Sequence, residues 1–562
     1  MRTFREATKY SMVIEGKPPL TLHRRVKNLG LKLQRDTRIS AINKQVRKQT
    51  DPDPKEQPIV FFNPSTRLSG FSQNAAFGLL ACWGLQIANQ IVVHFTCQGG
   101  MSRCVLGSDP DHFLREPPCR RCVNQSRRLQ ASTPVHWFTY NINSTLNNVL
   151  ERLSLDELHH FRWQVNSPGQ ILHGQILPLG EIVLPSLRWA LRRHHLQDNE
   201  TTLSFYKAYI QSACQVAVSF DQFISKYDPK VVVVFNGIMY PEATARWVAM
   251  SHGIRVITHE VGFQPFSVFF SGGQATAYPM NIPESFELSQ EDNQRLDSYL
   301  SKRFKGEFTM AGIKFWPAMS GLSDALLSKV NHFKQVVPVF TNVINDTSQI
   351  HASTVFSHMF DWLEHVLLVI EEHKDTLFVI RAHPDEKRRG TKKHSREPVS
   401  DWIIKNGVDQ MNNVIFVDSN ESLSSYDLIR KSKLVIVYNS SIGLEAALLG
   451  VPVLCGGKAR YTQYPTVFFP QTPEKFLKMA KEFLDTSTIN IPESFQKNAR
   501  RVLFWQLYRK SIPLGRYLSP HPTPGYVQLK KFSWQDLSVE NSPSMDVLVD
   551  GIVNGKPFLY YE

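Results

Sequence analysis

Residues 434–457, LVIVYNSSIGLEAALLGVPVLCGG, constrain the fold of this chain more than any other segment. A β-branched run at 434–437 predicts a buried strand, and a polar turn follows it at 439–441. A helical stretch, 442–449, then leads into a second apolar strand at 451–454. A strand–turn–helix–strand unit of this kind is the building block of an open parallel sheet.

The polar turn of this unit lies where a strand ends and a helix begins. The first N–H groups of a helix lack intrahelical partners and carry the positive end of its dipole, so Ser440 and Ser441 are placed to cradle a phosphate. Glu445 lies four residues after Ser441, where a carboxylate on the same side of the helix can hold sugar or ribose hydroxyls. The alternative is that the serines only cap the helix and Glu445 only favours its first turn.

The same alternation recurs on both sides of residue 330. Strands are predicted at 59–62, 91–95, 230–235 and 255–258 before it, and at 336–340, 376–381, 413–417, 434–437 and 451–454 after it. The sequence therefore predicts an α/β fold of two tandem Rossmann-like domains with a cleft between them. The expected parts are a basic N-terminal extension at 1–55, domains at 56–330 and 331–490, and a C-terminal helical tail at 491–562.

Composition and charge restrict the class of protein. A hydrophobic content of 42% and a charged content of 20% suit a folded chain. No apolar run approaches the roughly 20 residues of a membrane span, and residues 1–20 lack the core of a signal peptide, so a cytoplasmic location is expected. The net charge is +14, and residues 1–56 hold 14 basic and 6 acidic residues. That segment suits an amphipathic helix on an anionic membrane or a nucleic-acid backbone, or a solvated extension.

Polar residues follow several predicted strands. The strand at 376–381 ends in Arg381 and continues into His383-Pro384, and a guanidinium beside an imidazole suits a phosphate or a carboxylate. Asn342 follows the strand at 336–340, and Glu260 follows the strand at 255–258, where a carboxylate is a candidate general base. Because the carboxyl ends of parallel strands form one edge of a sheet, these residues are expected to face the cleft.

These elements together resemble the capsule polysaccharide biosynthesis family of bacterial glycosyltransferases. The matching pieces are VVVVFNG, ITHEVGF, VVPVFTNVIND, VIRAHPDEKRRG and VYNSSIGLEAALLGVPVLCGGKARYTQYP, in this order over roughly residues 230–470. The family is similar in outline to bacterial Kdo and sialic acid transferases, which have two Rossmann-like domains in the GT-B arrangement. Where sialic acid transferases have an acidic pair before a glycine, this chain has His259-Glu260-Val261-Gly262.

The resemblance implies metal-independent transfer of a sugar from a nucleotide-sugar donor to a surface or capsular glycan, free or lipid-linked. It implies that the first domain is the acceptor side and the second binds the donor, with Glu260 and His383 as catalytic residues. The implied donor-binding residues are Arg381, Asn342, Ser440, Ser441, Glu445 and Tyr464. Two alternatives stay open, a nucleotide-sugar epimerase and a basic nucleic-acid-binding protein with a zinc site. Peripheral contact with the inner face of a membrane is a further expectation, and nucleic acid is not expected.

Four cysteines cluster in the first domain. Cys97, Cys104, Cys119 and Cys122 lie in one insertion, 97–122, and form two pairs that fit a structural zinc site. A reduced and unliganded cluster, an iron–sulfur cluster and a redox-active set are the alternatives. Cys82, Cys214 and Cys455 lie in apolar surroundings and are expected in the core.

Overall fold

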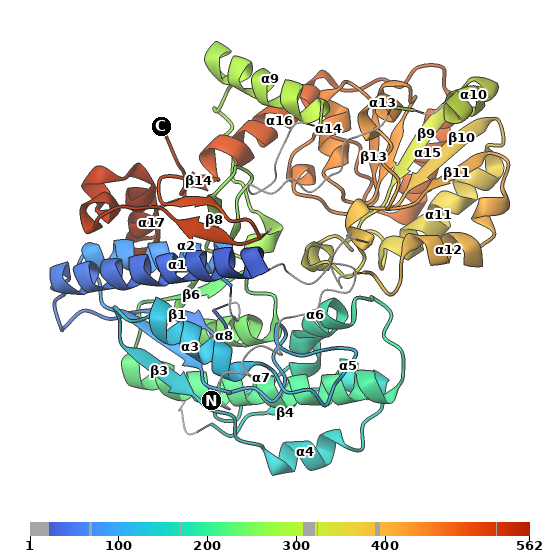
Figure 1. Cartoon of the computed structure of the whole chain (residues 1–562). Coiled ribbons are helices and arrows are strands. Elements are labelled where there is room, and N and C mark those ends of the chain that lie inside the picture. Colours follow the sequence, from blue (N-terminus) through green and yellow to red (C-terminus); the bar gives the residue numbers. More distant parts are fainter. Residues whose placement is uncertain are drawn as a thin grey trace.

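The computed structural model describes residues 22–66, 70–167, 171–306, 321–322, 324–387, 394–523 and 525–562. Two α/β domains lie against each other, and the C-terminal segment returns to the first of them (Figure 1). The predicted fold class, two tandem Rossmann-like domains, is confirmed. Residues 1–21 of the predicted basic extension lie outside the described residues.

The first domain is built on a seven-stranded sheet in the order β14-β8-β7-β6-β1-β2-β3. Its strands are β1 (Ile59–Asn63), β2 (Val92–Cys97), β3 (Val135–Phe138), β6 (Val231–Phe235), β7 (Arg255–Val261), β8 (Ser267–Ser271) and β14 (Ile512–Pro513). Strands β3, β2, β1, β6 and β7 are each parallel to their neighbours in the sheet. Ile59 of β1 is in register with Val92 of β2 and Val231 of β6. Taken in chain order, these five strands are wound 3-2-1-4-5, which is the Rossmann order.

Helices cover both faces of this sheet because its strands are apolar on both sides. Val60 and Phe62 pack in one core with helices α6 to α8, whereas Ile59 and Phe61 pack in another with α1, α2 and the C-terminal segment. The helices are α1 (Leu22–Gln49), α2 (Gln73–Ile87), α3 (Cys119–Leu129), α4 (Ser144–Leu150), α5 (Leu155–His159), α6 (Leu179–Leu191), α7 (Glu200–Tyr227) and α8 (Tyr240–Ser251). A two-stranded piece, β4 (Trp163–Gln164) with β5 (Ile176–Leu177), lies outside the main sheet.

The basic N-terminal segment differs from the predicted extension. Its described part is α1, in which Ile39, Ile42 and Val46 are buried against the first domain. The indole of Trp83 in α2 donates a hydrogen bond to Asn43 at 2.8 Å. An apolar face every third or fourth residue was present in the sequence, and it makes α1 an integral helix of this domain.

The second domain repeats the same winding in a five-stranded parallel sheet, ordered β11-β10-β9-β12-β13. Its strands are β9 (Gln335–Phe340), β10 (Thr376–Arg381), β11 (Val414–Val417), β12 (Val435–Val437) and β13 (Val453–Cys455). The helices around it are α9 (Gln290–Phe304), α10 (Asp324–His332), α11 (Met359–Glu372), α12 (Val399–Lys405), α13 (Ser425–Arg430), α14 (Ile442–Leu448), α15 (Pro473–Asp485) and α16 (Glu493–Phe504). Both faces of the sheet are again buried, one under α11, α12 and α15 and the other under α14 and α16.

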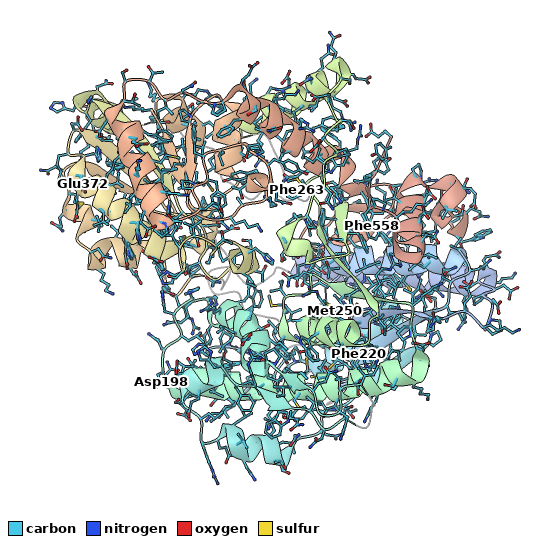
Figure 2. All side chains as sticks on the ribbon, turned by 180° about the vertical axis from the view of Figure 1, so that it is seen from behind. Asp198, Phe220, Met250, Phe263, Glu372 and Phe558 are labelled. Carbon is cyan, nitrogen blue, oxygen red and sulfur yellow. The ribbon has the colours of Figure 1, made fainter. Side chains whose placement is uncertain are left out.

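The expected domain boundaries change because the chain crosses between the domains twice. Helix α9, expected in the first domain, packs on α16 in the second. After a π-helical turn, η7 (Trp505–Arg509), the tail returns to the first domain and supplies β14, the hairpin β15 (Leu518–Pro520) with β16 (Val527–Leu529), and α17 (Pro543–Asn554). Figure 2 shows Phe558 of this tail beside the first domain, and Phe263 near the second domain. In the described chain, no helix is both long enough and apolar enough to span a bilayer.

Candidate active site

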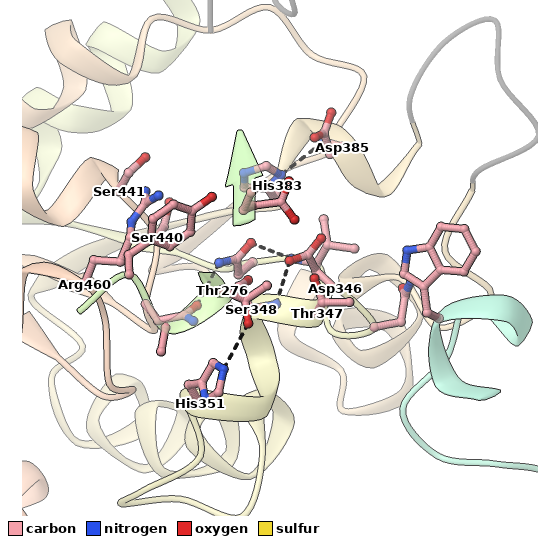
Figure 3. A pocket seen from close by; sticks show the side chains of 18 of the residues that line it. Thr276, Asp346, Thr347, Ser348, His351, His383, Asp385, Ser440, Ser441 and Arg460 are labelled. Atoms are coloured by element: carbon pink, nitrogen blue, oxygen red, sulfur yellow. Dashed lines mark hydrogen bonds between the residues drawn. The ribbon is translucent and has the colours of Figure 1, made fainter. Parts of the chain in front are cut away.

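A cavity of about 790 Å³ lies between the two domains, and both contribute to its wall. The first domain contributes Glu260, Thr276 and Tyr278, and the second contributes residues that follow four of its five strands. Those residues are Asn342 after β9, His383 after β10, Ser440 and Ser441 after β12, and Lys458 and Arg460 after β13. Figure 3 shows His383, Ser440, Ser441 and Arg460 among them. The cavity thus occupies the place where ligands bind in doubly wound sheets.

The Ser440-Ser441 turn is anchored by its backbone and presents its side chains to the cavity. The Tyr461 hydroxyl donates a hydrogen bond to the carbonyl of Ser440 at 2.8 Å. Ser441 is the N-cap residue of α14, but its side chain makes no capping hydrogen bond in the described structure. The capping interpretation therefore does not apply to Ser441, which lines the cavity.

An amide bridge spans the point where the strand order of the second sheet reverses. The side-chain N–H of Asn342, after β9, donates to the side-chain carbonyl of Asn439, after β12, at 2.7 Å. The carbonyl of Asn342 accepts from the backbone N–H of Val343 at 2.8 Å. Both polar atoms of Asn342 thus hold the loops of neighbouring strands, so its main task in the described structure is to shape the floor of the cavity.

His383 is oriented by the turn that follows it. Its Nδ1 accepts the backbone N–H of Asp385 at 3.2 Å, in the short 3-10 helix η4 (Pro384–Glu386). In a neutral imidazole with Nδ1 as acceptor, Nε2 carries the proton and is a donor. His383 therefore lines the cavity with an imidazole ring whose orientation this turn fixes.

Cationic side chains gather on the second-domain side of the cavity. Arg460 lies over two aromatic rings of the first domain, 4.4 Å from the ring centre of Phe263 and 5.0 Å from that of Tyr278. Burial lowers the pKa of Arg460, but an arginine keeps its charge at neutral pH. Lys458, two residues earlier, is exposed in the same loop.

Arg303 of α9 also lines the cavity, and a buried network holds it. Its guanidinium donates to Glu445 at 2.5 Å and to the Tyr299 hydroxyl at 3.0 Å. The second oxygen of Glu445 accepts from the Tyr426 hydroxyl at 2.5 Å. Burial is the largest influence on the pKa of Arg303 and lowers it, but Glu445 together with Tyr299 and Tyr426 outweighs burial, so the pKa lies above its usual value.

Glu260 of the first domain lines the same cavity as these second-domain residues. Its carboxylate accepts from the side-chain amides of Asn74 at 3.3 Å and Asn236 at 3.4 Å, and from the backbone N–H of Val261 at 2.9 Å. The predicted strand at 255–258 continues through this residue, because β8 pairs with the end of β7 as an antiparallel neighbour. Glu260 is thus held on a strand, where three donors fix its orientation.

Three predicted donor residues lie outside the cavity wall. Arg381 is buried and donates to the carbonyl of Leu423 and the hydroxyl of Ser425, so it fixes the loop before α13. Glu445 is buried behind the wall and acts on the cavity through Arg303. The hydroxyl of Tyr464 accepts the backbone N–H of Ile282 at 2.5 Å, in the connection between the domains. In each case a protein partner, which the sequence pattern does not show, fixes the side chain.

The search for polar residues at the ends of predicted strands also failed to identify some residues that line the cavity. Arg303 lies on a helix far from the sheet motifs, and no local signal marks it. Lys458 and Arg460 follow a predicted strand directly, so the same argument that found His383 could have found them. His351 lines the cavity and lies 3.1 Å through Nε2 from the hydroxyl of Thr276, across the domain boundary (Figure 3). Burial, with Lys458 and Arg246 nearby, lowers the pKa of His351.

Residues 320–477 match the family model described as capsule polysaccharide biosynthesis protein. The match includes β9 to β13 and every second-sheet strand end that faces the cavity. It leaves out the first domain, with Glu260 and the cysteine cluster.

Several solved structures are similar to this chain. Two are from Thermosulfurimonas dismutans KpsC: a beta Kdo 2,7 transferase (15% identity, 56% of this chain and 86% of that one, TM-score 0.33) and a beta Kdo 2,4 transferase (12%, 53% and 84%, 0.33). A UDP-GlcNAc 2-epimerase from Neisseria meningitidis has 13% identity over 80% of this chain and 98% of its own, with a TM-score of 0.21. No curated protein matches the chain.

Proposed function

We propose that this protein is a glycosyltransferase that moves a sugar from a nucleotide-sugar donor to a glycan acceptor in capsule or surface polysaccharide synthesis. One observation carries the proposal. A carboxylate of one domain and a set of phosphate-binding groups of the other, matched to the capsule polysaccharide family, line the same cavity.

In the proposed reaction the donor phosphate occupies the second-domain wall. The hydroxyls of Ser440 and Ser441, the imidazole of His383 and the cations Lys458 and Arg460 line this wall and are the proposed source of hydrogen bonds and positive charge. These groups stabilise the charge that grows on the phosphate as its bond to the anomeric carbon breaks. We propose that they do so without a metal ion.

Glu260 is the proposed general base. A hydroxyl oxygen of the acceptor attacks the anomeric carbon, a new carbon–oxygen bond forms, and the hydroxyl proton passes to the Glu260 carboxylate. Three hydrogen-bond donors aim this carboxylate from the first domain. A positioned base contributes about 10²- to 10⁴-fold to the rate of such a step.

The donor site is tested by thermal shift with CMP, CDP, UDP, GDP and their sugars. A ligand at about 100 times its dissociation constant should stabilise the wild type by about 2.7 kcal/mol. His383→Ala should lose this stabilisation while unfolding normally without ligand, because it removes the Nε2 donor. His332→Ala, an exposed histidine of α10, is the control and should respond as the wild type does. Wild-type nucleotide affinity in His383→Ala would refute the donor site.

The base is tested separately with Glu260→Gln, which keeps the size of the side chain. Donor binding should be unchanged, whereas transfer to acceptor should fall by about 10²-fold or more. Glu284→Gln, an exposed residue between the domains, should leave transfer unchanged. Conversion of the nucleotide sugar at full rate without acceptor would instead identify an epimerase, and steeply salt-dependent RNA or DNA binding would favour the nucleic-acid alternative.

A further inference from the structure

The segment 98–118 is the longest described stretch in the first domain without a helix or strand. Loops above about 12–15 residues are uncommon in compact domains unless they have a function or are held by something else. This loop forms part of the cavity wall through Val105, Leu106, Ser108 and Pro110. Cys97 precedes it at the end of β2, Cys104 lies within it, and Cys119 and Cys122 follow it on α3.

Two of the four sulfurs accept hydrogen bonds from the backbone of tight turns. The N–H of Gly100 donates to Sγ of Cys97 at 3.1 Å, and the N–H of Gly107 donates to Sγ of Cys104 at 3.2 Å. Each is a Cys-x-x-Gly turn with the same bond from the fourth residue to the first. Backbone donors of this kind stabilise negative charge on a sulfur, as the outer partners of metal ligands do.

Packing brings the second turn against the start of α3. A Cβ added to Gly107 would lie 2.7 Å from Sγ of Cys104 and 3.0 Å from Cβ of Pro117, so only glycine fits. Pro117 lies two residues before Cys119, which begins the Cys-x-x-Cys pair. The four sulfurs lie close enough for each to interact electrostatically with the other three.

We propose that Cys97, Cys104, Cys119 and Cys122 bind one structural zinc ion, which fixes the loop 98–118 as a wall of the cavity. Each thiol releases its proton to solvent as its sulfur becomes a ligand. The resulting four-thiolate site carries net negative charge, which Arg103, Arg120 and Arg121 beside the ligands offset. Among the described residues no three of these sulfurs lie within 4.8 Å of one another, so binding requires the cysteine side chains to move together.

A second group of candidate metal ligands, three histidines, has to be distinguished from the four cysteines. In the described chain, His194, His195 and His358 bring three ring nitrogens within 4.8 Å of one another, closer than the sulfurs. They lie at the contact between the domains, where Nε2 of His195 is 3.1 Å from Nε2 of His358. Metal content alone would not separate the two groups, so each needs its own variant.

The experiment measures zinc and iron per chain by mass spectrometry in the full-length protein purified without chelator. We expect about one zinc and no iron. Cys119→Ser should lower zinc several-fold, because it removes a half-buried ligand. His195→Ala and Cys214→Ala, a buried cysteine of α7 outside the cluster, should retain it.

A measurement on the wild type does not depend on how the variants fold. A thiol-specific mercurial should release the zinc, and cobalt in its place should show sulfur-to-cobalt charge-transfer absorption. Absence of zinc, iron in its place, zinc retained in Cys119→Ser, or zinc lost only in His195→Ala would each overturn the proposal.

Discussion

Glu445 and Arg303 show how a residue can influence the cavity from behind its wall. Both oxygens of Glu445 are bound by protein groups, one by Arg303 and one by Tyr426. The helix α14 carries the carboxylate and α9 carries the guanidinium, so the pair joins segments that are 142 residues apart in the chain. The position of the Arg303 charge at the cavity wall thus depends on an acid that lies behind the wall.

Glu386 predicts a pH dependence of stability. It follows the His383 turn, is buried, and accepts the backbone N–H of Val399 at the start of α12 at 3.2 Å. Burial raises the pKa of Glu386 from 4.5 to about 8. The folded state therefore binds a proton that the unfolded state has lost, and the stabilisation, full below pH 4.5, disappears as the pH rises to about 8.

The Glu386→Gln variant isolates this effect, because its neutral side chain keeps an acceptor for Val399. Between pH 5 and 8 the wild type should lose free energy of unfolding relative to the variant, by up to about 1.4 kcal/mol per pH unit. Denaturant unfolding at several pH values measures the difference. If the free energy of unfolding changed with pH in the same way in both proteins, the pKa of Glu386 would not be raised in the folded state.

At the scale of elements, short-range pattern predicted the central strands well. The β-branched runs at 230–235 and 336–340 became β6 and β9 within one residue, because buried parallel strands are apolar on both faces. The sequence did not reveal β8, which pairs antiparallel with β7, or the edge strand β14, which pairs antiparallel with β8 from more than 200 residues later in the chain. Partners distant in the chain leave no local signal.

The same limit applies to the candidate site. Position after a strand located His383, Ser440, Ser441, Asn342 and Glu260, all of which line the cavity. Position after a strand could not predict that Arg381, the last residue of β10, donates to the carbonyl of Leu423. That contact depends on the path of another loop. The roles of the residues that do line the cavity stay predictions.

The close packing between the end of β13 and α11 predicts that one added methyl group lowers the stability of the fold. Gly456 follows β13, and a Cβ there would lie 2.3 Å from the indole of Trp362, which is fully buried. Gly456→Ala should therefore lower the free energy of unfolding by about 1–3 kcal/mol through overpacking. Thermal and denaturant unfolding measure this, with Gly272→Ala as control because no atom lies within 4 Å of its Cβ position. Equal loss in both variants would contradict the argument.

At the scale of the molecule, the domains meet at two edges. At one edge the connecting segments run together, with the Trp505 indole donating to the carbonyl of Met280 at 2.9 Å. At the other, Glu397 of the second domain accepts the backbone N–H groups of His194 at 2.8 Å and His195 at 3.1 Å, and its other oxygen meets the His195 ring. The first edge is covalent, so the second is where the domains can separate.

Glu397→Ala should loosen that second edge, since three hydrogen bonds to one side chain are lost. We expect a larger radius of gyration by small-angle X-ray scattering and donor binding weaker by roughly fivefold or more, the effect of about 1 kcal/mol of coupling. Glu371→Ala, an exposed residue of α11 away from the boundary, is the control. Unchanged scattering and affinity would mean that Glu397 does not hold the domain arrangement.

The return of the tail to the first domain decides how this molecule can be taken apart. Arg255 at the start of β7 donates to the carbonyls of Gly551 and Val553 at 3.0 and 3.2 Å, so the first domain needs both ends of the chain. In the chain, the second domain forms one continuous stretch from about Met280 to Trp505. The indole of Trp505 donates a hydrogen bond to the carbonyl of Met280, so the two ends of this stretch lie together. A gene fragment for that stretch alone is the natural unit for dissection. The first domain would have to be made by splicing its two pieces with a short linker in place of the second.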